Sequence, residues 1–92
     1  MLSGSHERFE RSMGEFIRIE LELGTTFAFL ALDSKTEERR QKCRKNARKA
    51  YDTARHFWKE HPVREPTVQR SLLASLTTLT NLLLQLGETL EE

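Results

Sequence analysis

The sequence predicts an all-α protein built from three long antiparallel helices in an up-down-up bundle. Three successive segments repeat apolar residues at alternating steps of four and three positions. Charged residues make up 32% of the chain, and only two prolines interrupt it, which favours helices over strands. The spacing keeps one stripe of side chains on one side of a helix. Its period near 3.5 suits helices that pack along their lengths.

The first predicted helix spans about residues 6–32, and residues 1–5 are expected to be disordered. Its apolar ladder is Phe9, Met13, Phe16, Leu23, Phe27 and Leu30, interrupted at Glu20. A buried carboxylate without a partner is costly, so Glu20 is expected to pair with Arg40 or Arg44, or to be exposed at an interface. A functional role for this carboxylate is the alternative.

A second apolar face of this helix consists of Ile17, Leu21, Gly24, Ala28 and Leu32. Two interpretations stay open. In the first, the helix is wedged between the other two helices of its own chain. In the second, the five residues form a self-association interface of a homodimer, where Gly24 and Ala28 would let another helix approach closely. Three leucines off the ladder of the third helix add to the second interpretation, because contiguous exposed apolar patches usually mark contacts. They are Leu73, Leu82 and Leu84.

The second predicted helix spans about residues 35–60. The run Ser34-Lys35-Thr36-Glu37 has the capping-box pattern, which places the helix start there. The ladder that follows is Cys43, Ala47, Ala50, Ala54 and Phe57. His61 precedes Pro62 and ends the helix, because a residue before proline is pushed out of the helical region. A single cysteine on an apolar ladder favours a reduced, buried thiol and a cytoplasmic location.

The third predicted helix spans about residues 67–90 and completes a single domain over residues 1–92. Pro66 suits its first turn, and Thr67 is an alternative cap. Short connections between the helices predict antiparallel neighbours. The ladder of this helix is made of leucines alone, at Leu72, Leu76, Leu79, Leu83, Leu86 and Leu90.

The segment Leu23-Gly24-Thr25-Thr26-Phe27 resembles the first helix of a tetratricopeptide repeat, in which Leu-Gly precedes an aromatic residue. Ala47, Tyr51 and Ala54 resemble the second helix, where small residues let the two helices pack closely. The spacing between the two motifs exceeds that of a repeat of ~34 residues. The resemblance covers residues 23–62 and implies a repeat-like helical hairpin that binds proteins or peptides. It assigns no ligand-contacting residue.

The net charge of +1 conceals a segregation along the chain. Residues 1–33 hold three Lys/Arg against six Asp/Glu, residues 34–60 hold ten against four, and residues 61–92 hold two against four. With its ladder on the core, the second helix presents Lys42, Lys45, Arg48 and Lys49 on its outer side. These four are candidate contacts for phosphates or an acidic partner. The alternative is a solvated face, partly neutralised by glutamates of neighbouring helices.

The sequence contains no nucleophile with an adjacent base, no Gly-rich phosphate loop and no redox Cys pair. We therefore expect no enzymatic activity, no cofactor and no metal. The longest apolar run, residues 27–32, is far shorter than the ~20 residues that a membrane span needs. The expected function is a self-associating protein–protein interaction module, a homodimer with an unidentified protein partner. The alternative is a nucleic-acid-associated factor that uses the basic face of the second helix.

Overall fold

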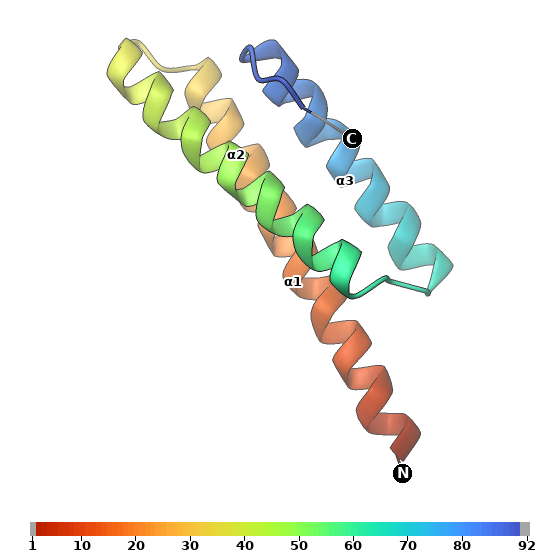
Figure 1. Ribbon diagram of the computed structural model, residues 1–92. Helices are drawn as coiled ribbons and strands as arrows, with labels where there is room; N and C mark the ends of the chain where they lie inside the picture. The colour runs from red at the N-terminus through yellow and green to blue at the C-terminus, as the bar shows by residue number, and fades with distance from the viewer. Residues whose placement is uncertain (1, 91–92) are drawn as a thin grey trace.

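The computed structural model consists of three helices, α1 (Leu2–Leu32), α2 (Glu37–Glu60) and α3 (Pro66–Gln85), which run up, down and up (Figure 1). It describes the backbone of residues 2–90 and the side chains of residues 12–90. The described backbone contains no strand, so the predicted all-α class is confirmed. The bundle is elongated, at 54 × 20 × 18 Å. Helix α1 has the most contact with α2, whereas α2 and α3 have the least contact with each other.

Local hydrogen bonds explain where the helices begin. Helix α1 starts four residues before the predicted position, so residues 2–5 are helical, and Met1 lies outside the described residues. Helix α2 starts at Glu37 because the Thr36 hydroxyl accepts a hydrogen bond from the Arg39 N–H at 3.2 Å. The prediction that Ser34 caps α2 is wrong, because the Ser34 hydroxyl donates to the Leu30 carbonyl of α1 instead.

Helix α3 is capped by Glu65, with Pro66 at its first position, as expected for a residue without an N–H. The Glu65 carboxylate accepts hydrogen bonds from the N–H groups of Thr67 and Val68, at 3.2 and 2.9 Å. These bonds lower the pKa of Glu65. The alternative cap at Thr67 is therefore not used.

The end of α3 lies at Gln85, five residues before the predicted end. Gly87 has a φ of 88°, a left-handed conformation that glycine adopts without steric strain. The Gly87 N–H donates to the Leu84 carbonyl and the Glu88 N–H donates to the Leu83 carbonyl, which is the Schellman motif. The chain therefore turns off the helix axis after α3 (Figure 1). Leu90, beyond this turn, packs against the core.

Helices α1 and α2 pack through small residues. A Cβ at Gly24 would lie 3.2 Å from the Ala50 Cβ and 3.4 Å from the Ala47 carbonyl oxygen. It would also lie 2.7 Å from Cδ2 of Leu79, which reaches this seam from α3. At this seam the helices approach too closely for large side chains, so small residues of α1 and α2 meet there with Leu79 of α3. Buried Cys43 and Ala54 extend this seam along α2, as its ladder predicted.

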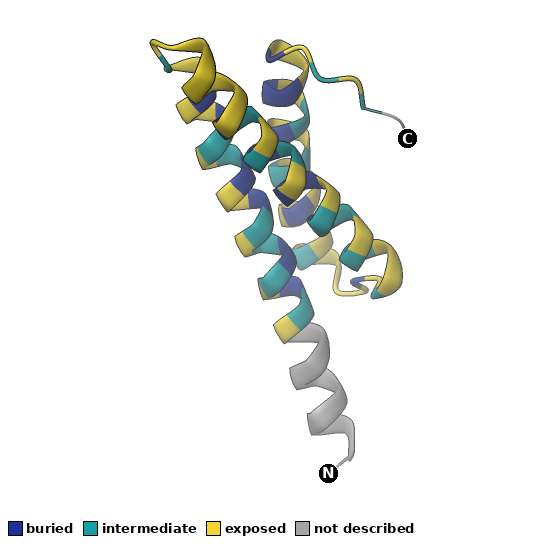
Figure 2. Cartoon of the chain, turned by 60° about the vertical axis from the view of Figure 1, so that its left-hand side comes forward, coloured by how far each residue is buried: buried dark blue, intermediate teal, exposed yellow. Residues whose placement is uncertain are grey.

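The face of α1 that was a candidate for self-association is instead the buried face (Figure 2). Ile17, Leu21 and Ala28 have no exposed surface, and Gly24 is buried, whereas Leu32 is 37% exposed. The structure therefore supports the wedged interpretation and corrects the placement of a homodimer interface on these residues. Four of the five candidates are enclosed by the chain's own helices and are not accessible to a second copy.

The predicted core ladder of α1 lies on the outer side of the helix. Leu23 and Leu30 are 44% and 40% exposed, and the side chains at Met13, Phe16 and Phe27 are half-buried. The Phe9 side chain lies outside the described residues. In α3, Leu82 is buried, whereas Leu73 and Leu84 are more than half exposed.

Candidate functional site

An exposed apolar ridge runs along α1. We define this α1 ridge as Phe16, Ile19, Leu23, Phe27 and Leu30. Ile19, Leu23 and Leu30 are 52%, 44% and 40% exposed, and the two phenylalanines are half-buried. The ridge lies outside the buried face of α1, which includes Ile17, Leu21, Gly24, Ala28 and Ala31. The ridge side chains therefore remain partly or largely exposed.

One flank of α2 lies alongside the ridge. At one end, the Phe16 and Phe57 rings pack edge to face, with centroids 5.0 Å apart. At the other end, Leu30 and Arg39 line a shared hollow of about 350 Å³ at the α1–α2 turn. Between Arg39 and Phe57, steps of three and four residues define one stripe of α2. Its intermediate members are Lys42, Asn46, Lys49 and Thr53. We call Arg39, Lys42 and Lys49 the basic stripe.

A second surface covers the outer side of α2. The four predicted basic residues, Lys42, Lys45, Arg48 and Lys49, all line an open hollow of about 670 Å³. Arg44 and Glu88 line it as well. Asp52 is a second carboxylate in its lining, so the structure brings the predicted set together and adds one arginine and two carboxylates to it.

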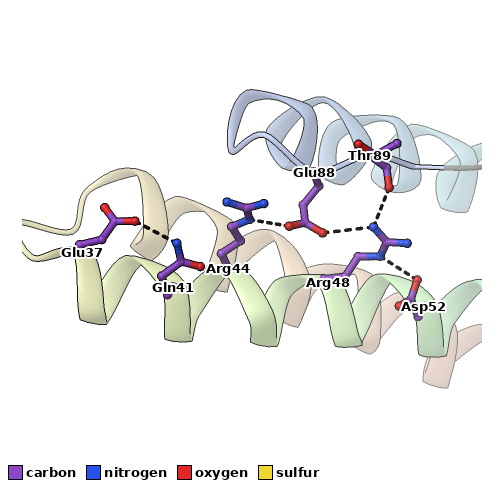
Figure 3. A network of polar contacts seen from close by, with 7 residues as sticks. All are labelled: Glu37, Gln41, Arg44, Arg48, Asp52, Glu88 and Thr89. Atoms are coloured by element: carbon purple, nitrogen blue, oxygen red, sulfur yellow. Dashed lines mark hydrogen bonds and ion pairs between the residues drawn. The ribbon is translucent and has the colours of Figure 1, made fainter.

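Glu88 lies between two arginines of α2 (Figure 3). Arg44 Nε donates to one carboxylate oxygen at 2.5 Å, and Arg48 Nη1 donates to the other at 3.1 Å. Arg48 also donates to the Thr89 carbonyl and pairs with Asp52 at 3.0 Å. The hydrogen bond from Arg44 is the main cause that lowers the pKa of Glu88. The hydrogen bond to Asp52 is the main cause that raises the pKa of Arg48.

This arrangement contradicts the ion pair that was predicted between Glu20 and Arg40 or Arg44. Glu20 is half-buried and forms no ion pair with Arg40 or Arg44 among the side chains that the structure describes. Arg44 is directed to Glu88 instead, because the Schellman turn carries Glu88 over α2. The remaining expectation for Glu20, partial exposure beside an interface, is compatible with its place next to the α1 ridge.

The basic residues differ in their availability. Arg48 is engaged by Asp52, Glu88 and Thr89, whereas the exposed residues Lys42, Lys45 and Lys49 form no ion pair within residues 12–90. The predicted neutralisation of this face by neighbouring glutamates therefore holds for the two arginines and not for the three lysines.

Comparison with protein families, curated proteins and solved structures gives no match. The chain resembles none of them significantly. Among the described residues, no three His, Cys, Asp or Glu side chains come together as a metal site would require. No described helix has both the length and the apolar composition needed to cross a bilayer.

Four residues of these surfaces are absent from the sequence-based candidates, and one of them is Arg39, which was assigned to no surface. Ile19 was not assigned to either face of α1, and Arg44 was considered only as a partner for Glu20. Glu88 was placed inside a helix that extended to Leu90. The Leu-Gly pair at Leu86 and Gly87 is the signal that identifies the helix end, since glycine is favoured one position after the last helical residue.

Proposed function

We propose that this protein is a non-enzymatic helical interaction module that associates with a second copy of itself through the α1 ridge. The proposal is carried by the exposure of three large aliphatic side chains, Ile19, Leu23 and Leu30, on one side of a single helix. Scattered exposed leucines need no explanation, but a contiguous apolar surface usually marks a contact site. Covering this ridge would remove it from water, which favours association.

Four ridge residues, together with Thr26 in place of Phe27, have a spacing that supports a second copy as the partner. Phe16, Ile19, Leu23, Thr26 and Leu30 follow one another at steps of three, four, three and four. Two helices that both carry this heptad spacing can interlock side chains as knobs into holes. A second copy of the chain presents the same spacing by definition. Thr26 is the polar member of this seam, and its hydroxyl donates to the Glu22 carbonyl of its own helix.

A non-catalytic role is supported by the arrangement of the charged groups. Arg44 and Arg48 share Glu88, and Arg48 also pairs with Asp52, so two positive and two negative charges neutralise one another as structural ion pairs do. The proposed function needs no cofactor. The repeat-like hairpin over residues 23–62 and the cytoplasmic location remain part of the proposal. The contact of Gly24 with Ala47 and Ala50 supports the former, and the buried thiol of Cys43 supports the latter.

Light scattering coupled to size-exclusion chromatography tests this proposal over a series of protein concentrations. We expect a dimer whose fraction rises with concentration. Leu23→Glu should give a monomer of unchanged helical content, because it places a charge on the ridge outside the core. Leu73→Glu is the matched control, since Leu73 is an exposed leucine of α3 at 54% and should leave the dimer intact. A wild-type chain that stays monomeric at every concentration would contradict the proposal.

A second candidate function, binding of nucleic acid, is favoured by one observation. Lys42, Lys45 and Lys49 are exposed on one face of α2 and have no acidic partner in the described part of the chain. Such lysines can neutralise phosphates in a salt-dependent manner. Absorbance at 260 nm in the same chromatography tests this candidate. Bound nucleic acid that is removed by salt, and lost when Lys42, Lys45, Arg48 and Lys49 are all changed to Glu, would support it.

A further inference from the structure

The two edges of the α1 ridge carry opposite charge. Phe16 lies on the edge nearer α2, because its ring contacts Phe57. Glu15 and Glu22 are seven residues apart and lie on the other edge. Their side chains are 56% and 60% exposed, and both pair with Arg18, so this edge keeps one net negative charge. The edge nearer α2 is bordered by the basic stripe, in which Lys42 and Lys49 are exposed and unpaired within the described residues.

The charged residues also lie at matching heights along the bundle. Gly24 of α1 packs against Ala47 and Ala50 of the antiparallel helix α2. Glu22, half a turn before Gly24, is therefore level with the turn of α2 that contains Lys49. A neighbouring helix placed in register with α1 would bring its own Glu22 to the height of Lys49.

Twofold symmetry allows two ways to pair identical ridges, and the charges discriminate between them. An antiparallel pair places both α2 helices on the same side of the seam, so the two basic stripes lie next to each other. A parallel pair places them on opposite sides, so each basic stripe borders the acidic edge of the other copy. Opposite charges at an interface fix its orientation and register, and like charges exclude alternatives.

We infer that two copies pair through parallel α1 helices, with Glu22 of each copy facing Lys49 of the other. This inference rests on the proposed self-association through the α1 ridge. Glu20 also lies on the edge nearer α2, where Lys42 and Lys49 of the same chain outweigh its negative charge.

The area of the α1 ridge also supports a contact that includes the basic stripe of α2. The ridge covers residues 16–30, which is about 21 Å of helix at 1.5 Å per residue. A stable interface buries about 800 Å² on each partner, which is more than a single narrow helix stripe of that length provides. The basic stripe of α2 is the adjacent surface that would enlarge the contact.

Sedimentation equilibrium of the full chain and of charge variants tests the inference. Lys42→Glu combined with Lys49→Glu should weaken dimerisation about tenfold, because twofold symmetry repeats each surface ion pair. Adding Glu22→Lys to that variant should restore the wild-type dissociation constant. The control is Lys45→Glu with Arg70→Glu, which makes the same change in net charge at exposed positions outside the stripe. It should dimerise like the wild type.

The outcomes separate the inference from the proposed function. If Leu23→Glu abolishes the dimer while the stripe variant and the control have equal dissociation constants, self-association through the ridge stands and the parallel, charge-matched arrangement is refuted. If Lys42→Glu with Lys49→Glu weakens the dimer and the addition of Glu22→Lys weakens it further, the pairing of Glu22 with the basic stripe is refuted. If the wild type does not dimerise, both the proposed function and this inference fail.

Discussion

Gly24 is the residue at which all three helices meet. An alanine there would gain about 1 kcal/mol of helix propensity over glycine. Its methyl group would lie 2.7 Å from the buried Leu79 side chain and 3.2 Å from the Ala50 Cβ, however, so α1, α2 and α3 would have to shift. Overpacking of this kind costs about 1–3 kcal/mol. The steric term is the larger one because Leu79 has no exposed surface into which it can move.

We therefore expect Gly24→Ala to lower the free energy of unfolding by about 1 kcal/mol, the difference between these two effects. Gly14→Ala is the matched control in the same helix, because its Cβ would meet only Val68 Cγ1, at 3.4 Å. That variant should be stabilised by as much as 1 kcal/mol, or about the helix-propensity gain. Urea unfolding followed by circular dichroism measures both. Equal shifts of the same sign in the two variants would show that the close approach at Gly24 has no energetic role.

At the scale of elements, the contact of α2 with the end of α3 depends on one carboxylate. The side chain of Glu88 is 16% exposed and is held by Arg44 and Arg48. Because the pKa of Glu88 is lower in the folded chain than its ordinary value of 4.5, folding favours the ionised form. Its contribution to stability is complete above pH 4.5 and is lost as the pH falls through the folded-state pKa.

Glu88→Gln should therefore lower the free energy of unfolding by about 1 kcal/mol at neutral pH. This value is smaller than that of a fully buried charged hydrogen bond, because solvent reaches the Glu88 carboxylate. The difference between variant and wild type should shrink as the pH is lowered below 4.5, where wild-type Glu88 becomes protonated. Chemical denaturation at pH 7 and pH 3 measures this difference. An equal deficit at both pH values would indicate lost packing and not a lost ion pair.

The whole molecule depends on Leu79, because this α3 side chain reaches the seam between the other two helices. Leu79→Ala should lower the free energy of unfolding by about 3 kcal/mol through lost burial and the cavity that remains. Leu84→Ala, at a position 52% exposed, should change it by less than about 0.5 kcal/mol. Calorimetry of both variants checks this expectation. Similar melting temperatures for the two would show that α3 does not seal the bundle.

The sequence was sufficient to predict the helix count, the connections and the buried stripes of α2 and α3. It was misleading for α1, because apolar size does not indicate which face is buried when the neighbouring helix also presents alanines. Gly24 packs against Ala47 and Ala50, and Ala28 is buried on the same face, whereas the larger Leu23 and Leu30 are 44% and 40% exposed. The basic cluster was predictable from spacing alone. The Glu88 contact was not, because it depends on where Gly87 turns the chain.

Cys43 gives the folded protein an internal reporter. It is the only cysteine of the chain, and its side chain is buried in the core face of α2. A thiol reagent in solution reaches this sulfur efficiently only when α2 separates from its neighbours. The rate of labelling under native conditions therefore measures how often the bundle opens, without denaturant and without any engineered probe. Dimerisation through the α1 ridge would slow that opening. The labelling rate of Cys43 would therefore also report dimerisation, although the thiol does not belong to the ridge.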